Sequence, residues 1–140
     1  MTSAFMQLRP GEVTVHPPQQ FYAGDTWPIS AVCTDGDGAT LDLSAAEVEW
    51  VLNDIAADGV SDGVNKLTLS VGAGIALVEN TSGDLVPGLI LITVTPSQSA
   101  PLPVGFYRDQ LQVSIGGQVF TQFRGRIEVL AKLHQAVSGN

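Results

Sequence analysis

The sequence is poor in the residues that build disulfides and metal sites. Its 140 residues include one cysteine and two histidines. The lone cysteine, Cys33, has no partner for an internal disulfide. His16 and His134 lie near opposite ends of the chain, outside any HxxxH or HExxH spacing. We therefore expect no disulfide and no metal site, and we expect Cys33 on a core face, where thiols are unreactive.

Positive charge and long hydrophobic runs are scarce as well. Six Lys and Arg stand against 14 Asp and Glu, a net charge of −8, which disfavours binding to nucleic-acid phosphates. The longest apolar run, LVPGLILITV at 85–94, is about half of what a membrane-spanning helix requires. The opening MTSAFMQLRPGE lacks the features of a secretory signal. We expect a soluble protein made in the cytosol, without a nucleic-acid or membrane partner.

The sequence also lacks complete motifs for catalysis or cofactor binding. No G-x-S-x-G elbow occurs. DGDG at 35–38 resembles the start of a calcium loop, but Ala39 and Ala46 stand where two oxygen ligands belong. VGAGIA at 71–76 has Leu77 in place of the third glycine of a dinucleotide-binding loop. Both are predicted to be turns, so we expect no enzyme activity, no catalytic residue and no cofactor.

What the chain does have is alternation of apolar and polar residues. With 44% apolar and 14% charged residues it fits one globular domain. Val48, Trp50 and Leu52 illustrate the alternation, clusters of Gly, Asp and Asn separate the alternating segments, and no segment keeps a helical period for ten residues. This pattern predicts an all-β fold, an antiparallel β-sandwich with Greek-key connections. The expected strands are 12–16, 26–34, 39–43, 47–53, 66–71, 75–79, 88–95, 105–115 and 119–131.

The chain divides into three parts. We expect an N-terminal arm with a first strand at 1–22, the β-sandwich at 23–131, and a C-terminal tail at 132–140. PPQQ at 17–20 is predicted to be a strand switch or hinge. PSQSAPLP at 96–103, with three prolines, is expected to cross between the sheets with a short helical turn.

The last two predicted strands form a hairpin whose register follows from its apolar residues. The alternation places Tyr107, Leu111, Ile115, Val119 and Phe123 on core faces. For the faces of the two strands to coincide, residue i must lie opposite residue 234 − i, which sets Ile115 opposite Val119 and Leu111 opposite Phe123. The connection is then the three-residue loop GGQ at 116–118, with glycine available for the left-handed position.

The same register gathers three arginines on the outer face of the hairpin. It sets Arg108 opposite Arg126, and Arg124 opposite Gln110. Like charges opposed across strands cost a few tenths of a kcal/mol or more. Two interpretations stay open. Either the arginines splay apart in water within an acidic surface, or they form a protein-interface patch that meets carboxylates of another protein.

Two features resemble immunoglobulin-like sandwiches. GFY at 105–107 resembles the tyrosine corner, in which the hydroxyl of a residue such as Tyr107 bonds to an upstream loop carbonyl. Trp50 lies on a strand where such folds place a core tryptophan. Without a disulfide, packing alone would hold the sandwich. Asp109 falls on the inward parity opposite Gly125, and we expect it at the end of the sandwich, bonded to backbone or hydroxyl groups.

The order of motifs over residues 23–131 resembles small immunoglobulin-like modules of tailed-bacteriophage virion proteins, similar to the N-terminal module of baseplate upper proteins and to tail-fibre attachment modules. The shared features are Gly-Asp before a strand, DLS before the Trp strand, a Thr-Pro crossing, LPVGFY with LQV, and a closing GRIEVL. The resemblance implies a virion structural protein without catalytic residues, made in the host cytoplasm. It implies contacts with neighbouring virion proteins and a homo-oligomer in the assembled particle. This sequence ends soon after the module, without the fibre shaft or receptor-binding head of multidomain members, which favours an adaptor or a decorating part. We expect a tail, baseplate or fibre-attachment adaptor.

Two alternatives stay open. The first is a capsid-surface decoration protein, which would be present in hundreds of copies per particle. The second is a carbohydrate-binding module that uses Phe21, Tyr22 and Trp27 as an exposed, coplanar aromatic surface. Core packing is the other interpretation of these three aromatic residues.

Overall fold

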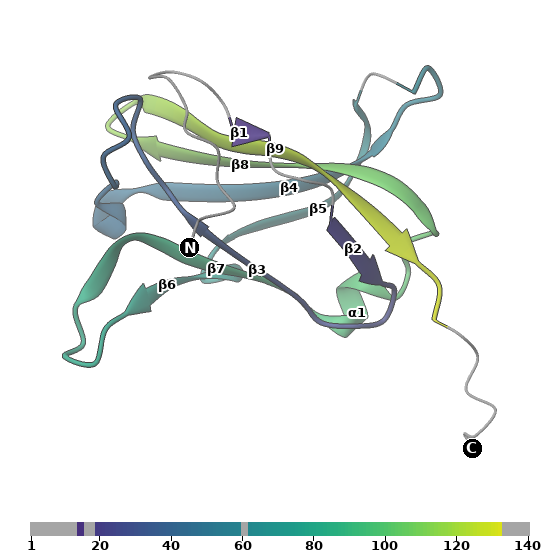
Figure 1. Ribbon diagram of the computed structural model, residues 1–140, viewed down its shortest axis with the longest axis horizontal. Coiled ribbons are helices and arrows are strands. Elements are labelled where there is room, and N and C mark those ends of the chain that lie inside the picture. Colours follow the sequence, from purple (N-terminus) through teal and green to yellow (C-terminus); the bar gives the residue numbers. More distant parts are fainter. Residues whose placement is uncertain (1–13, 16–18, 60–61, 133–140) are drawn as a thin grey trace.

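The computed structural model describes residues 14–15, 19–59 and 62–132 (Figure 1). Almost all regular structure in these ranges is strand, so the predicted all-β class is confirmed. None of the helices in these ranges has the length and apolar character needed to cross a membrane. The elements of the described chain are β1 (Thr14–Val15), β2 (Gln19–Tyr22), β3 (Trp27–Val32), the 3₁₀ helix η1 (Leu43–Ala45), β4 (Glu47–Ile55), β5 (Asp62–Val71), β6 (Gly74–Glu79), β7 (Leu85–Val94), α1 (Pro96–Ser99), β8 (Gly105–Ile115) and β9 (Gln118–Leu130).

The strands follow one path of hydrogen-bonded neighbours, β1-β9-β8-β4-β5-β6-β7-β3, and β2 also pairs with β9. Figure 1 shows β4, β8 and β9 in one layer and β3, β6 and β7 in the other. Parallel pairing that begins with Ser70 and Gly74 connects the layers through β5 and β6. The mixed sheet nearly closes into a barrel, because Gln122 of β9 bonds to Thr34, just beyond β3 at the far end of the path.

The prediction of a purely antiparallel sandwich is wrong in three pairings. β1 and β2 both run parallel to β9, and β5 runs parallel to β6. Between β5 and β6 the chain turns at Gly72, whose φ of 85° is left-handed, and enters the other layer instead of folding back as a hairpin. Alternation reports which side chains face the core, and it carries no information about the direction of the neighbouring strand.

The core lies between the two layers and contains both tryptophans. In β4, Val48, Trp50 and Leu52 are buried and alternate with outward-facing residues, as the sequence pattern predicts. Burial of each large apolar side chain contributes roughly 1.5–3 kcal/mol to folding. The buried apolar residues are Trp27, Ile29, Cys33, Leu41, Leu43, Val48, Trp50, Leu52, Leu69, Ile75, Ile90, Ile92, Val94, Leu102, Tyr107, Leu111, Val113, Phe123, Ile127 and Val129.

The predicted strand at 39–43 is wrong. Thr40 makes only an isolated bridge with Thr34, and the 3₁₀ helix η1 begins at Leu43. The Asp42 side chain accepts a hydrogen bond from the backbone N–H of Ser44 at 3.0 Å and caps this helix. Such a local bond offers the backbone an alternative to a strand ladder, which alternation alone does not reveal.

Two connecting segments were also predicted. Gln19 and Gln20, from the predicted hinge, lie in β2 and pair with β9, so the hinge is wrong at these two positions. The crossing at 96–103 does contain the expected short helix, α1, which begins after Thr95. Thr95 and Gln98 form a reciprocal capping box, which satisfies backbone N–H groups at the start of α1.

The predicted register of the last hairpin is confirmed from Gly105 to Leu111, where each pair of residue numbers sums to 234. Beyond Leu111 the sum falls to 233, as in Gln112 opposite Thr121. Gln122 is the extra residue of a β-bulge at this step. The extra residue reverses the parity of β9 towards the loop, so the predicted core position of Val119 is wrong: Val119 is 59% exposed, and Phe120 packs against the core instead. The bulge was not predicted, because Val119 and Phe120 are both apolar and either one continues the alternation.

The bulge shortens the hairpin connection. The loop consists of Gly116 and Gly117, with φ of 57° and 86°, and Gln118 already pairs with β8. The predicted three-residue loop is therefore wrong. Two consecutive left-handed residues form a tight turn whose twist matches that of the flanking strands, and glycine adopts this conformation without steric cost.

Candidate protein-interaction surface

The three arginines of the hairpin lie together on the outer face of the sheet. Arg108 of β8 is directly opposite Arg126 of β9, and Arg124 is opposite Gln110, as the register predicts. On the other side of β8, Arg108 is opposite Asn53 of β4. Arg124 and Arg126 are exposed and Arg108 is half-buried. The sheet therefore brings three of the chain's six basic residues into one cluster.

An aromatic ring orients one of these arginines. The guanidinium carbon of Arg126 lies 4.1 Å from the ring centroid of Phe106, which is 46% exposed. A cation over an aromatic face at an exposed site gains about 0.5–1 kcal/mol. Across from Phe106, Glu128 accepts a hydrogen bond from the side-chain amide of Gln20 at 2.8 Å. Arg126 is thus positioned over an apolar surface.

The opposite end of the same face is acidic. Glu47 and Glu49 are exposed and point outward from β4, opposite Ser114 and Gln112 of β8. These glutamates were not among the predicted interface residues, although their i, i+2 spacing on the outward parity of β4 was the available signal. We call this outer side of β4, β8 and β9 the charged face; its residues are Glu47, Glu49, Arg108, Gln110, Gln112, Arg124 and Arg126.

Exposed apolar residues border the arginine end of the charged face. Tyr22 is 46% exposed and pairs with Leu130 at the end of β9. Leu130 is two residues beyond Glu128, which lies opposite Phe106. Val104, just before β8, is also exposed. Tyrosine and arginine side chains next to apolar surface are the groups most enriched among energetically dominant interface residues.

Beneath the charged face, the predicted core residues hold the sheet together. Trp50 is fully buried, and its indole N–H donates to a carboxylate oxygen of Asp109 at 3.0 Å. Asp109 lies opposite Gly125, as expected from the register, but in the middle of β8. The expectation of a position at the end of the sandwich is wrong. Parity places Asp109 inward, and a buried indole N–H requires an acceptor.

Tyr107 anchors the start of β8. Its hydroxyl donates to the backbone carbonyl of Pro103, four residues upstream. Burial raises the pKa of Tyr107, and the nearby negative charge of Asp54 raises it further. Leu111 and Phe123 are buried directly opposite each other in the same hairpin. These contacts hold the arginine-bearing strands against the core.

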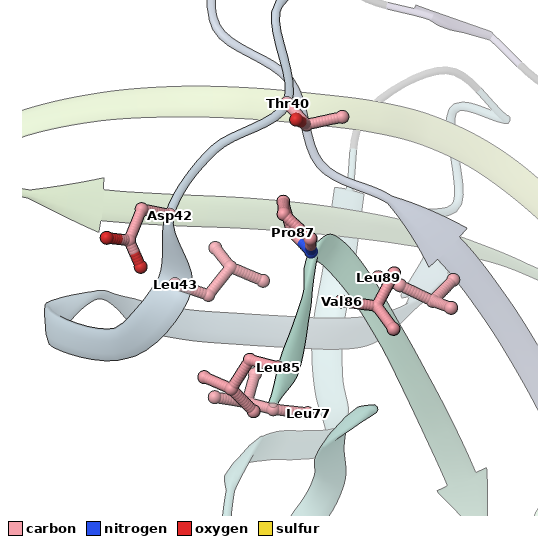
Figure 2. Close-up of a pocket in the computed structure, with 8 residues that line it drawn as sticks. All are labelled: Thr40, Asp42, Leu43, Leu77, Leu85, Val86, Pro87 and Leu89. Carbon is pink, nitrogen blue, oxygen red and sulfur yellow. The ribbon is translucent and has the colours of Figure 1, made fainter. Parts of the chain in front are cut away.

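Two hollows of the surface are defined by described residues. The first hollow, drawn in Figure 2, is lined mainly by apolar residues of β6, β7, the segment before η1, and η1 itself. Its volume is about 460 Å³. Its single carboxylate, Asp42, is engaged in capping η1, and the backbone hydrogen bond from Ser44 lowers the pKa of Asp42. A second hollow of about 420 Å³ lies beside Glu47 and Glu49 on the edge of the charged face.

Residues 14–15, 19–59 and 62–132 contain no group of three His, Cys, Asp or Glu side chains that could hold a metal ion. His16 and His134 lie outside these ranges. Cys33 is fully buried, and burial raises the pKa of its thiol to about 11, so the thiolate that nucleophilic chemistry needs is not formed near neutral pH.

The three aromatic residues considered for sugar binding do not form an exposed platform. Trp27 is fully buried and stacks on Phe21, with ring centroids 5.0 Å apart and an interplanar angle of 15°. The Trp27 indole donates to the backbone carbonyl of Tyr22. Only Tyr22 presents a substantial exposed ring, so Phe21 and Trp27 serve core packing.

No protein-family model and no curated protein matches the chain. Among solved structures, the chain is similar to the N-terminal domain of phage TP901-1 ORF48, with 16% sequence identity and a TM-score of 0.41. The match covers 82% of this chain and 84% of that domain's chain.

Proposed function

We propose that this chain is a non-enzymatic structural protein of a bacteriophage virion, a tail, baseplate or fibre-attachment adaptor that binds neighbouring subunits through the arginine end of the charged face. The observation that carries the proposal is the pairing of Arg108 with Arg126 on an outer sheet face. Like charges that lie directly opposite each other across strands are unfavourable. Carboxylates of a neighbouring protein would relieve this cost through bidentate contacts with the guanidinium groups.

The motif order over residues 23–131 supports placing this contact in a virion, where structural modules assemble by protein contacts. The fold that accompanies the proposal is an immunoglobulin-like sandwich with Greek-key connections. The bond from Tyr107 to the Pro103 carbonyl and the buried Trp50 support this assignment, since both are features of such sandwiches. The module is then held by packing, since its one cysteine cannot form an internal disulfide.

The test is to locate and count the chain in purified virions assembled in cells that express it. An adaptor of the tail is expected in small multiples of three or six copies at one position. Hundreds of copies on the capsid, or absence from the virion, would contradict the proposal.

The double variant Arg108→Glu/Arg126→Glu then tests the surface. It is expected to remain folded, with melting shifted by a few degrees, while its incorporation into virions falls. The control is Lys66→Glu/Lys132→Glu, which makes the same change in net charge away from this cluster. It also breaks the ion pairs of Lys66 with Asp54 and of Lys132 with Asp25, so its melting is measured alongside its incorporation. Normal incorporation of the arginine variant into virions would contradict the claim that the arginine end binds a neighbouring subunit.

A further inference from the structure

The charged face has a basic end and an acidic end on one continuous surface. Arg108 and Arg126 lie in one cross-strand row, and Glu49 lies opposite Gln112, four residues along β8 from Arg108. At about 3.4 Å per residue, Arg108 and Glu49 are separated by roughly 14 Å along the strands. Between them, Gln110 and Gln112 are neutral hydrogen-bonding side chains.

This arrangement is complementary to itself. In a two-fold symmetric dimer, if residue i of the first copy contacts residue j of the second copy, then residue j of the first copy contacts residue i of the second. A two-fold axis that lies in the plane of the charged face, between its two ends, brings the basic end of each copy over the acidic end of the other. Both copies then gain the same set of opposite-charge contacts.

The charge of the whole chain makes this orientation selective. Each copy carries a net charge of −8, so most ways of bringing two copies together oppose acidic surfaces. Half of the chain's basic residues lie at the arginine end, and this is where another copy of the acidic chain finds opposite charge. The ring of Phe106 already holds the Arg126 guanidinium, so less side-chain freedom is lost on binding a carboxylate.

We propose that the partner of the charged face is a second copy of this chain, in a two-fold dimer that pairs Arg108 and Arg126 of each copy with Glu47 and Glu49 of the other. The inference rests on the proposed function, because it names the neighbour that the arginine end binds. Gln110 and Gln112 lie near the axis, where they meet their own counterparts and exchange amide hydrogen bonds.

Sedimentation equilibrium of the full chain tests the dimer directly. The wild type is expected to dimerise, and both Arg108→Glu/Arg126→Glu and Glu47→Lys/Glu49→Lys are expected to raise the dimer Kd by about 100-fold or more, because like charges then meet at both contacts. A mixture of the two variants is expected to form a one-to-one heterodimer with an affinity near that of the wild type. In the mixture, every reversed end meets a reversed end of the opposite sign.

The mixture separates this proposal from a general effect of net charge or of misfolding. The control pairs Lys66→Glu/Lys132→Glu and Asp37→Lys/Asp84→Lys make the same charge changes outside the charged face, and they are expected to dimerise like the wild type. A wild type that stays monomeric up to about 1 mM, or a variant mixture without heterodimer, overturns the dimer. Neither outcome removes the chain from the virion, because the location experiment tests that claim separately.

Discussion

The side chain of Gln122 binds the backbone of Thr34 in both directions. The Thr34 N–H donates to Oε1 of Gln122 at 2.7 Å, and Nε2 of Gln122 donates to the Thr34 carbonyl at 2.9 Å. A neighbouring strand would satisfy these two backbone groups in the same way. Gln122 reaches them because it is the extra residue of the β9 bulge, and bulges redirect a side chain. One amide thus connects β9 to the segment that follows β3.

Replacing Gln122 with Ala is expected to lower the free energy of unfolding by about 1–3 kcal/mol, because two partly buried backbone groups lose their partner. Denaturant unfolding measures the change. Gln118→Ala, at an exposed position of the same strand, is the control and is expected to stay within about 0.5 kcal/mol of the wild type. Equal effects at the two positions would show that the bridge does not stabilise the closed sheet.

Trp50→Ala is expected to cost about 3–5 kcal/mol, because it removes a fully buried indole and leaves a cavity. It also removes the hydrogen bond to Asp109 in the core. The control is Val119→Ala, at a position that is 59% exposed. A loss below about 1 kcal/mol for Trp50→Ala in equilibrium unfolding would mean that the core has been misidentified.

Gly88→Ala is expected to destabilise the protein more than Gly83→Ala. Both glycines have left-handed φ, of 77° and 85°, so both substitutions bring backbone strain of about 1–3 kcal/mol. A Cβ at Gly88 would also lie 2.6 Å from the carbonyl oxygen of Cys33, whereas one at Gly83 meets nothing within 4 Å. Thermal melting of the two variants compares them, and a larger loss at Gly83 would contradict the close packing of β7 against Cys33.

Alkaline pH is expected to destabilise the protein partly through Cys33. Burial raises the pKa of its thiol from 9.0 to about 11, so the folded state holds the proton more tightly than the unfolded state. The resulting stability is complete below pH 9.0 and is lost as the pH rises towards about 11. Cys33→Ala should show a weaker decline in melting temperature over this range. Equal declines in the melting temperature of the two proteins would show that the thiol does not contribute. The raised pKa of Tyr107 also lowers stability at alkaline pH, and it does so in both proteins.

Periodicity explains which parts of the fold could be predicted. The inward parity of Tyr107, Leu111 and Phe123 was sufficient to give the register of the last hairpin, and with it the opposition of Arg108 and Arg126. The β-bulge at Gln122 was not predictable, because Val119 and Phe120 are both apolar, and only the register in space decides which of them faces the core. The acidic end of the charged face was missed for a related reason, since it becomes part of one surface with the arginines only when β4 pairs with β8.

The sequence by itself determined the strand-rich class, the residues that face the core, and the pairing within the β8–β9 hairpin, because these follow from local alternation and a short connection. Tertiary structure alone decided that β1 and β2 lie parallel to β9, that β5 passes parallel to β6 into the second layer, and that Gln122 reaches Thr34. These contacts join segments distant in sequence or change layers at a turn. Their free energy depends on which surfaces meet in space, and a period-two pattern does not encode that choice.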